Sequence, residues 1–322
     1  MSKITLLDLE KISGVSKTTI SRYLSGSRVS QAKVKKIEEA IAASGYIRNN
    51  FAQLLRTTQS NLIGVIVPDL DNPFFLKIIK RLEELASQRG KTLIIKTTQR
   101  SVELELKSID FIRGFMVEAL FLCRSELTDY QLSQLKIETP VFSIDKEFDN
   151  VYSIISNNYQ SSFDLTTHLL ENCDRNLLFF SRLHESNSVH ERIRGFRDAC
   201  SEKRKIPYEF KYNVDLPINF DALLDTVKSK AICGIICRND NEAVKVQSYF
   251  NDMYSRKLIN RIKVCGFDNI SLSKHVIPTL TTVDQEIEEM CDIAFSLFTS
   301  KDFFNPRTII HEAKLLIRDS TR

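Results

Sequence analysis

The chain has 322 residues, 43% of them hydrophobic and 27% charged, which is the composition of a folded protein rather than a disordered one. This length predicts two or three domains, each large enough to bury an apolar core. No apolar run approaches the roughly 20 residues of a membrane-spanning helix, and the N-terminus lacks the apolar segment of a secretory signal. We therefore expect a cytoplasmic protein with no membrane partner.

Neither the cysteines nor the histidines are spaced as metal ligands. The seven cysteines include no C-x-x-C pair, and Cys233 and Cys237 lie inside an apolar, strand-like run, so buried reduced thiols are expected. The nine glycines contain no G-x-G pair, and no G-x-S-x-G sequence is present. We expect no metal, no cofactor and no catalytic residue, and only a Cys/His nucleophile assembled in space is left open.

Positive charge is concentrated at the N-terminal end. Residues 1–60 hold ten of the 45 basic residues and four of the 41 acidic ones, a balance of +6. The remaining 262 residues hold 35 basic and 37 acidic residues, a balance of −2. This asymmetry is typical of a nucleic-acid-binding head on a neutral body, with a merely solvated basic face as the alternative on charge alone.

Three short helices are expected in this head. Thr5 can cap the first helix with Asp8 as its capping-box partner, and Gly14 ends it. Ser16 can cap the second helix and Ser30 the third. Two helices joined by a tight glycine turn and braced by a third make a helix-turn-helix, whose second helix enters the major groove. The side chains that this helix offers to the groove are Lys17, Thr18, Ser21 and Arg22.

From residue 61 onward, short β-branched runs alternate with helical stretches. One series of strand-like runs spans 62–68, 92–97, 119–123, 141–145 and 152–156. A second series spans 176–181, 231–237 and 262–267, and a last strand is expected near 315–317. Runs at this spacing with helices between them predict doubly wound parallel sheets. The expected fold class is an all-α head followed by a two-lobed α/β body.

Polar residues that follow the predicted strands are candidates for a binding site. Ligands of open parallel sheets bind beyond the carboxyl ends of the strands, and two facing lobes enclose a cleft there. Carboxylates, amides and a few aromatic rings suit a polyhydroxylated ligand, so a sugar is expected first. The candidates are Asp69, Asp71, Phe74, Gln99, Arg100, Cys123, Arg124, Asp145, Asn157, Asn239, Asp240 and Asp268.

A succession of motifs runs the length of the chain. After the head, "IGVIVPDLDNPFF" is followed by "RIRGF", "RNDNEAV", "VCGFDN", "PTLTTVDQ" and "LLIRDST". Together with residues 5–56, these motifs resemble the LacI-type family of bacterial transcriptional regulators, which includes the lactose and purine repressors. The resemblance covers the whole chain and implies a periplasmic-binding-protein-like body whose two lobes are joined by three crossings.

The resemblance also sets the expected domain boundaries. Residues 1–47 would form the helix-turn-helix domain, 48–60 a hinge, and 61–322 the effector-binding and dimerisation domain. The leucine repeat that makes some relatives tetramers is absent, so a homodimer is expected. The two lobes would span about 61–158 plus 285–305, and about 159–284 plus 306–322.

The family binds double-stranded operator DNA, and its DNA contacts carry over to the head and the hinge. The residues implied for base edges are Lys17, Thr18 and Arg22. The residues implied for phosphates are Ser16, Thr19, Ser21 and Arg28. The segment 48–60 reads by itself as a flexible linker, but in the family it becomes a helix in the minor groove. There Asn50 would cap the helix, Leu55 would wedge between bases and Arg56 would reach phosphate.

A small-molecule effector pocket carries over as well. The effector-binding residues that we expect, from the resemblance and from their places after strands, are Phe74, Arg100, Asp145, Asn157, Arg192, Asn239 and Asp268. The presence of Arg100 as well as Arg192 makes a sugar acid or sugar phosphate a further hypothesis beside a neutral sugar. Asn157 and Glu10 depart from the family pattern, which has an acidic and a small residue there.

These observations predict a repressor of a carbohydrate-utilisation operon whose DNA affinity is switched by a sugar or sugar-acid effector. An activator or a corepressor-dependent regulator of the same fold stays open, because the position of the operator decides between repression and activation. A sugar-binding receptor without DNA function would share the body, but the basic head argues against it.

Overall fold

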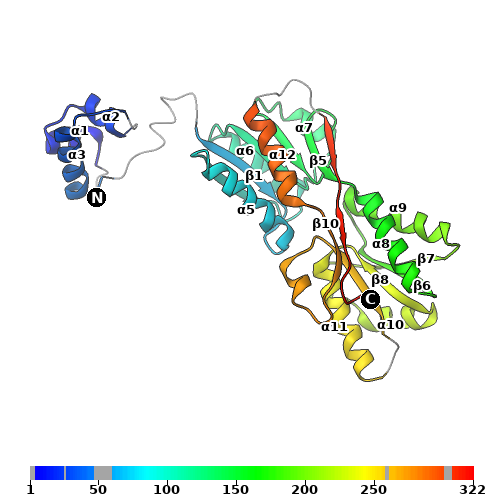
Figure 1. Ribbon diagram of the computed structural model, residues 1–322. Coiled ribbons are helices and arrows are strands. Elements are labelled where there is room, and N and C mark those ends of the chain that lie inside the picture. Colours follow the sequence, from blue (N-terminus) through cyan, green and yellow to red (C-terminus); the bar gives the residue numbers. More distant parts are fainter. Residues whose placement is uncertain (1–3, 25–26, 47–59, 258–260, 301–306) are drawn as a thin grey trace. The chain divides into compact units, whose positions relative to one another are not determined.

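The computed structural model describes residues 4–24, 27–46, 60–257, 261–300 and 307–322 (Figure 1). Their contacts divide the chain into two compact units, residues 1–60 and residues 61–322. Each unit is described by itself below. Within the described ranges, no helix combines the length and the apolar character that crossing a membrane requires.

The head consists of three helices, α1 (Leu6–Ser13), α2 (Lys17–Leu24) and α3 (Gln31–Ser44). The predicted capping box forms, because the Thr5 and Asp8 side chains each accept the other's backbone N–H. Gly14, with φ of 65°, ends α1 in the left-handed conformation that favours glycine. The helices enclose a small apolar core made of Leu9, Val15, Ile20, Ile37 and Ala40.

Two of the predicted caps differ from the expectation. Ser30 precedes α3, but its side chain makes no capping hydrogen bond. The Ser16 hydroxyl lies 3.0 Å from the Thr19 hydroxyl, and the first N–H of α2, that of Lys17, is held by the Glu10 carboxylate at 2.9 Å. A side chain seven residues upstream therefore satisfies the first amide of α2, which local capping rules do not anticipate.

The first lobe is a parallel sheet with the strand order β11-β5-β4-β3-β1-β2. Helices α5 (Pro73–Ser87) and α12 (Ile287–Ser300) pack on one face. Helices α6 (Val102–Arg113) and α7 (Asp129–Gln134) pack on the other. The strands are β1 (Leu62–Val67), β2 (Thr92–Thr97), β3 (Ala119–Cys123), β4 (Val141–Ile144), β5 (Tyr152–Ser156) and β11 (Thr308–His311).

The second lobe repeats this plan with the strand order β12-β10-β9-β8-β6-β7, in which only the β10–β12 pair is antiparallel. Helices α8 (Asn158–Asn172) and α9 (Asn187–Glu202) cover one face. Helices α10 (Phe220–Ser229) and α11 (Asp240–Ser255) cover the other. A short 3₁₀ helix, η1, spans Ser271–Lys274. The strands are β6 (Asn176–Arg182), β7 (Pro207–Tyr212), β8 (Ile232–Cys237), β9 (Lys263–Phe267), β10 (Thr281–Asp284) and β12 (Lys314–Leu316).

The fold class predicted from the sequence, a helix-turn-helix head on two doubly wound lobes, is confirmed. One predicted boundary is wrong, because residues 306–322 were assigned to the second lobe. Strand β11 pairs with β5 at the edge of the first sheet, from Thr308 with Ser153 to His311 with Ser156. The chain therefore enters the second lobe only after His311, since β5 has an open edge that this β-branched run completes.

Three crossings join the lobes, between β5 and α8, between β10 and α12, and between β11 and β12. Two hydrogen bonds tie them together. The backbone N–H of Asn157 donates to the carbonyl of His311 at 2.9 Å. The Lys314 ammonium donates to the Glu286 carboxylate at 2.8 Å. The three crossings therefore form one bundle at the lobe boundary.

Candidate functional site

The exposed face of α2 carries the residues predicted to read DNA bases. Lys17, Thr18 and Arg22 are exposed, whereas Ile20 on the opposite face is fully buried. Of the residues predicted to hold phosphates, Ser16 and Arg28 are exposed and Thr19 and Ser21 are half-buried. The burial pattern leaves this helix free to present hydroxyl and cationic groups to a groove.

Glu10 places a negative charge at the start of this same helix. Its Oε1 atom accepts the N–H of Lys17, which is one of the amides that a helix N-terminus leaves open for an anion. A carboxylate thus occupies an amide that a helix N-terminus otherwise leaves open to an anion. The hinge residues Asn50, Leu55 and Arg56 lie outside the described residues, so their predicted roles stay predictions.

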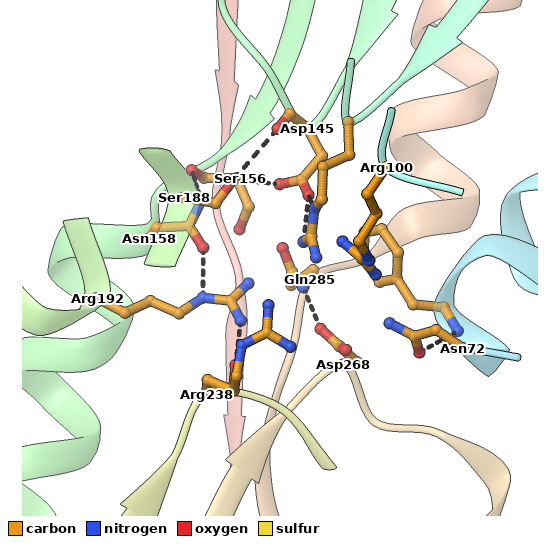
Figure 2. A network of polar contacts seen from close by, with 12 residues as sticks. Asn72, Arg100, Asp145, Ser156, Asn158, Ser188, Arg192, Arg238, Asp268 and Gln285 are labelled. Atoms are coloured by element: carbon orange, nitrogen blue, oxygen red, sulfur yellow. Dashed lines mark hydrogen bonds and ion pairs between the residues drawn. The ribbon is translucent and has the colours of Figure 1, made fainter. Parts of the chain in front are cut away.

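In the body, the structure brings Arg192, Asp145 and Asp268 into one polar network between the lobes (Figure 2). Arg192 is only 1% exposed. Its Nε donates to the Asn158 side chain at 2.8 Å, and its Nη1 donates to the backbone carbonyl of Arg238 at 2.7 Å. Its Nη2 has no hydrogen-bond partner among the described atoms. One buried donor therefore remains for a ligand.

The glycine of the R-x-x-G-F motif makes this arrangement possible. A Cβ atom at Gly195 would lie 2.3 Å from the backbone oxygen of Tyr159, so only glycine lets α9 pack this closely on α8. The close packing brings Arg192 of α9 within hydrogen-bonding distance of Asn158 of α8. The guanidinium also lies 4.3 Å from the centre of the Phe267 ring.

Asp145 is held in a buried ion pair within the first lobe. Arg124 Nε donates to its Oδ2 at 2.5 Å, and the Arg124 guanidinium lies 5.0 Å from the ring centre of Phe74. From the second lobe, the Ser188 hydroxyl donates to Asp145 Oδ1 at 3.0 Å. Phe74 was predicted to line the pocket, but its ring is fully buried under Arg124.

Asp268 lies opposite, on the second lobe, and accepts a hydrogen bond from the Gln285 side-chain amide at 2.6 Å. Burial raises the pKa of Asp268 above its ordinary value, while the nearby Arg192 and Arg124 guanidinium groups oppose this rise. Burial likewise lowers the pKa of Arg192 to about 10, and Asp268 opposes that fall. The protein groups around Asp268 and Arg192 therefore compensate only in part for the water that these two charges lose on burial.

The backbone at these positions is also unusual. Arg124, Asp145 and Asp268 directly follow strands and have φ values of 49°, 65° and 105°, in the region that non-glycine residues rarely adopt. Such conformations gather at ligand-binding and catalytic sites, where the surrounding fold holds them in place. The strand ends therefore position these side chains at the cost of local backbone strain.

Arg100 and Asn239 lie in a different part of the cleft, which we call the outer chamber. This recess of about 700 Å³ is lined by both lobes, with Asp69 and Arg100 from the first and Arg182, Glu242 and Lys245 from the second. Arg100 pairs with Asp69 at 2.7 Å. Asn239 lines the chamber and caps α11, accepting the N–H of Glu242 at 3.1 Å.

Asn157 is not among the described hydrogen-bond partners of Arg192. Its side chain caps α8 by accepting the N–H of Gln160, and it lies at the crossing between the lobes. The next residue, Asn158, makes the contact with Arg192 instead. A shift of one residue at a helix start turns the side chain to another face, and the sequence does not fix that start to within one residue.

Four residues of the network had no predicted role, namely Asn158, Ser188, Arg238 and Gln285. Arg238 and Gln285 directly follow β8 and β10, as the predicted candidate Arg124 follows β3. The rule that ligand-binding residues follow parallel strands found Arg124 and would also have found these two. Ser188 and Asn158 start helices, and no comparable signal marks them.

Comparison with known proteins matches each unit to a family model. Residues 5–49 match the family described as bacterial regulatory proteins, lacI family, and residues 166–321 match the periplasmic binding protein-like domain. Among curated relatives, the ribose operon repressor of Halalkalibacterium halodurans is 27% identical, with 99% of this chain and 97% of that protein covered. The catabolite control protein A of Priestia megaterium is 25% identical, with 95% and 94% covered.

Solved structures agree in fold. The lac repressor dimer bound to operator and the anti-inducer ONPF has a TM-score of 0.84 at 21% identity, with 99% of each chain covered. A periplasmic binding protein/LacI transcriptional regulator from Alkaliphilus metalliredigens QYMF, complexed with D-xylulofuranose, has a TM-score of 0.71 at 25% identity, with 81% of this chain and 99% of that chain covered. Head, body and motif order therefore lead to one conclusion: the chain joins a LacI-family head to a periplasmic-binding-protein-like body and is similar over its whole length to LacI-family repressors.

Proposed function

We propose that this protein is a homodimeric DNA-binding transcriptional regulator that represses a carbohydrate-utilisation operon and is switched by a sugar or sugar-acid effector. The observation that carries the proposal is the pairing, in one chain, of an exposed hydroxyl- and cation-bearing helix with a buried cleft that holds an unsatisfied arginine donor. It acts in the cytoplasm, at the chromosome, and without catalysis.

DNA recognition rests on α2 and the residues around it. Lys17, Thr18 and Arg22 read base edges in the major groove, and each good base contact contributes about 1–3 kcal/mol of discrimination. The phosphate contacts come from Ser16, Thr19, Ser21 and Arg28. Binding releases cations condensed on the DNA, and this release becomes less favourable as the salt concentration rises, so DNA affinity falls with salt. Leu55 of each hinge enters the minor groove with Asn50 and Arg56 beside it.

The effector is recognised by the network between the lobes. The carboxylates of Asp145 and Asp268 accept hydrogen bonds from sugar hydroxyls, and Arg192 Nη2 donates to a hydroxyl or carboxylate oxygen. The relatives support a sugar, since they include ribose and sucrose operon repressors and a complex with D-xylulofuranose. Two of these groups lie on the second lobe and one on the first, so the ligand bridges the lobes.

Closure of the lobes links the effector to DNA. The lobes already contact each other where Ser188 meets Asp145 and where Lys77 of α5 donates to the carbonyl of Asn269 at 2.7 Å. An effector that favours one lobe spacing shifts the population of the dimer toward it, and DNA changes effector affinity by the same factor. We propose release by an inducer as the direction of this coupling.

The test measures, by fluorescence anisotropy at about 50–200 mM salt, the binding of the purified full-length protein to DNA from upstream of its own gene and of neighbouring genes. We expect tight, salt-sensitive binding to one near-palindromic site, and release by a sugar or sugar acid. Arg22→Ala should lose discrimination at one base pair, whereas Ser21→Ala should weaken all sequences alike. Tightening of the complex by the sugar would indicate a corepressor, and absence of DNA binding would reject the proposal.

A further inference from the structure

Two cysteines of the second lobe lie side by side, outside the polar network between the lobes. Cys173 directly follows α8 as its C-terminal cap residue, and Cys233 is the second residue of β8. The Cys173 thiol donates a hydrogen bond to the sulfur of Cys233, and both thiols are free of disulfides. Arg238 of the network follows the opposite end of β8. The cysteine pair is therefore separate from the candidate effector site.

A β-bulge brings Cys233 to its partner. Ile232 and Gly234 of β8 align with consecutive residues of β6, so Cys233 is the extra residue of this strand. Its side chain packs against the apolar cluster between the sheet and helices α8 and α9, to which Cys173 also belongs. A Cβ atom at Gly234 would lie 3.5 Å from the Cys173 sulfur, so this sulfur touches the backbone next to Cys233. The bulge thus puts both sulfur atoms on one face of the sheet.

The two thiols differ in exposure and in acidity. Cys173 is only 6% exposed, whereas Cys233 is half-buried. The hydrogen bond from Cys173 lowers the pKa of Cys233, and the backbone N–H of Arg175 lowers it further, while burial opposes both effects. The same hydrogen bond raises the pKa of Cys173. Cys233 is therefore the nucleophile, and Cys173 is the thiol poised to react with its oxidised form.

The other five cysteines lack this combination of exposure and acidity. Each of them is buried, and burial raises the pKa of each thiol. They are Cys123, Cys200, Cys237, Cys265 and Cys291. Buried thiols of this kind stay protonated at neutral pH and react slowly with oxidants. Any selective oxidation of the chain should therefore begin at Cys233.

We propose that Cys233 and Cys173 form a hydroperoxide-sensitive dithiol that closes to a reversible disulfide. The Cys233 thiolate attacks one oxygen of hydrogen peroxide, the O–O bond breaks, and the products are a sulfenic acid on Cys233 and hydroxide. The Cys173 sulfur then attacks the Cys233 sulfur, so that an S–S bond forms and the S–OH bond breaks. The hydroxide leaves with the Cys173 proton as water. The sulfur atoms are oxidised and the peroxide is reduced.

The experiment treats the reduced, purified full-length protein with equimolar hydrogen peroxide at neutral pH. Mass spectrometry of peptides prepared without reductant then locates the oxidised cysteines. We expect a single disulfide between Cys173 and Cys233, which dithiothreitol reverses, and no reaction at the other cysteines. Cys173→Ser should leave a sulfenic acid on Cys233 that dimedone traps. Cys233→Ser should leave Cys173 reduced, because its own thiol is buried and protonated.

Cys200→Ser is the matched control, because Cys200 is buried in the same apolar cluster. It should form the disulfide as the wild type does, and circular dichroism establishes that each variant is folded. Oxidation of the wild type that begins at another cysteine would overturn the proposal, as would a sulfinic acid on Cys233 without a bond to Cys173. Absence of any oxidation would also overturn it. None of these measurements involves DNA or a sugar, so the proposed function is tested separately.

Discussion

Replacing Arg192 by lysine should destabilise the body more than replacing it by methionine. Burial lowers the pKa of Arg192 well below its ordinary value, to about 10, and since each pKa unit corresponds to about 1.4 kcal/mol, burying the charge costs about 3 kcal/mol. Methionine removes this cost but leaves the Asn158 and Arg238 acceptors unpaired, at about 1–3 kcal/mol each. The free energy of unfolding of the methionine variant should therefore lie within about 3 kcal/mol of that of the wild type.

Lysine keeps the positive charge but lacks the planar guanidinium, whose several N–H groups can donate to two acceptors at once. Its single ammonium group can reach at most one of the two acceptors, and it is more strongly hydrated than a guanidinium. We expect the lysine variant to be about 1–2 kcal/mol less stable than the methionine variant, which is a midpoint difference of about 2–8 °C for a domain of this size. Both variants should lose effector binding, because neither can hold Asn158 and the ligand together.

Thermal unfolding followed by circular dichroism at pH 7 and pH 9 provides the measurement. Burial depresses the pKa of the introduced lysine, so the unfolded state binds more protons and stability rises with pH. The deficit of the lysine variant should therefore shrink at pH 9. Arg194→Lys and Arg194→Met, at an exposed position of the same helix, should agree within about 0.5 kcal/mol. A lysine variant as stable as wild type at pH 7 would refute the reasoning.

Three further predictions follow from other contacts. Glu10→Gln keeps an acceptor for the Lys17 N–H but removes a negative charge beside the DNA-binding face. Fluorescence anisotropy should therefore show severalfold tighter binding to operator and random DNA alike. Unchanged affinity would contradict this prediction. Asp268→Asn should raise the thermal midpoint at pH 8 and not at pH 4. Burial raises the pKa of Asp268, so the stability of the wild type falls as the pH rises through that pKa. A gain in midpoint that does not depend on pH would contradict burial of this carboxylate as the cause. Cys233 should react first with iodoacetamide by mass spectrometry at pH 7.5, because a hydrogen bond from the Cys173 thiol lowers the pKa of Cys233 to about 7; prior labelling of any other cysteine would show otherwise.

The sequence predicted the strands whose side chains are buried on both faces of the sheet. Strands β1 and β3 are continuous apolar runs because both of their faces are covered by helices, and such runs are unambiguous. Strand β7, Pro207–Tyr212, was missed because it lies at the sheet edge and alternates charged with aromatic residues. Strand β10 was missed because Thr281 and Thr282 are buried polar residues whose partners lie on distant segments.

The candidate site was predictable where it depends on single strands and not where it depends on contacts between distant segments. Asp145 and Asp268 each follow a strand, so the topology alone places them at the cleft. The contact of Arg192 with the Arg238 carbonyl joins residues 46 positions apart, and that of Ser188 with Asp145 joins the two lobes. Such pairings depend on how finished elements pack, which no local pattern encodes.

The link between ligand and lobe movement lies in Gln285. It is the first residue of the crossing between β10 and α12, and its amide donates to Asp268, the carboxylate that we expect to bind the effector. The next residue, Glu286, is tied to Lys314 of another crossing. A ligand hydroxyl that donated to Asp268 Oδ1 would compete with Gln285 for that oxygen, and the displaced amide would need a new partner. Because the crossings are hydrogen-bonded to one another, a change at Gln285 is felt by the segments that set the angle between the lobes. If Asp268 binds the effector as proposed, effector binding and lobe geometry share one hydrogen bond, which is the physical requirement for coupling them.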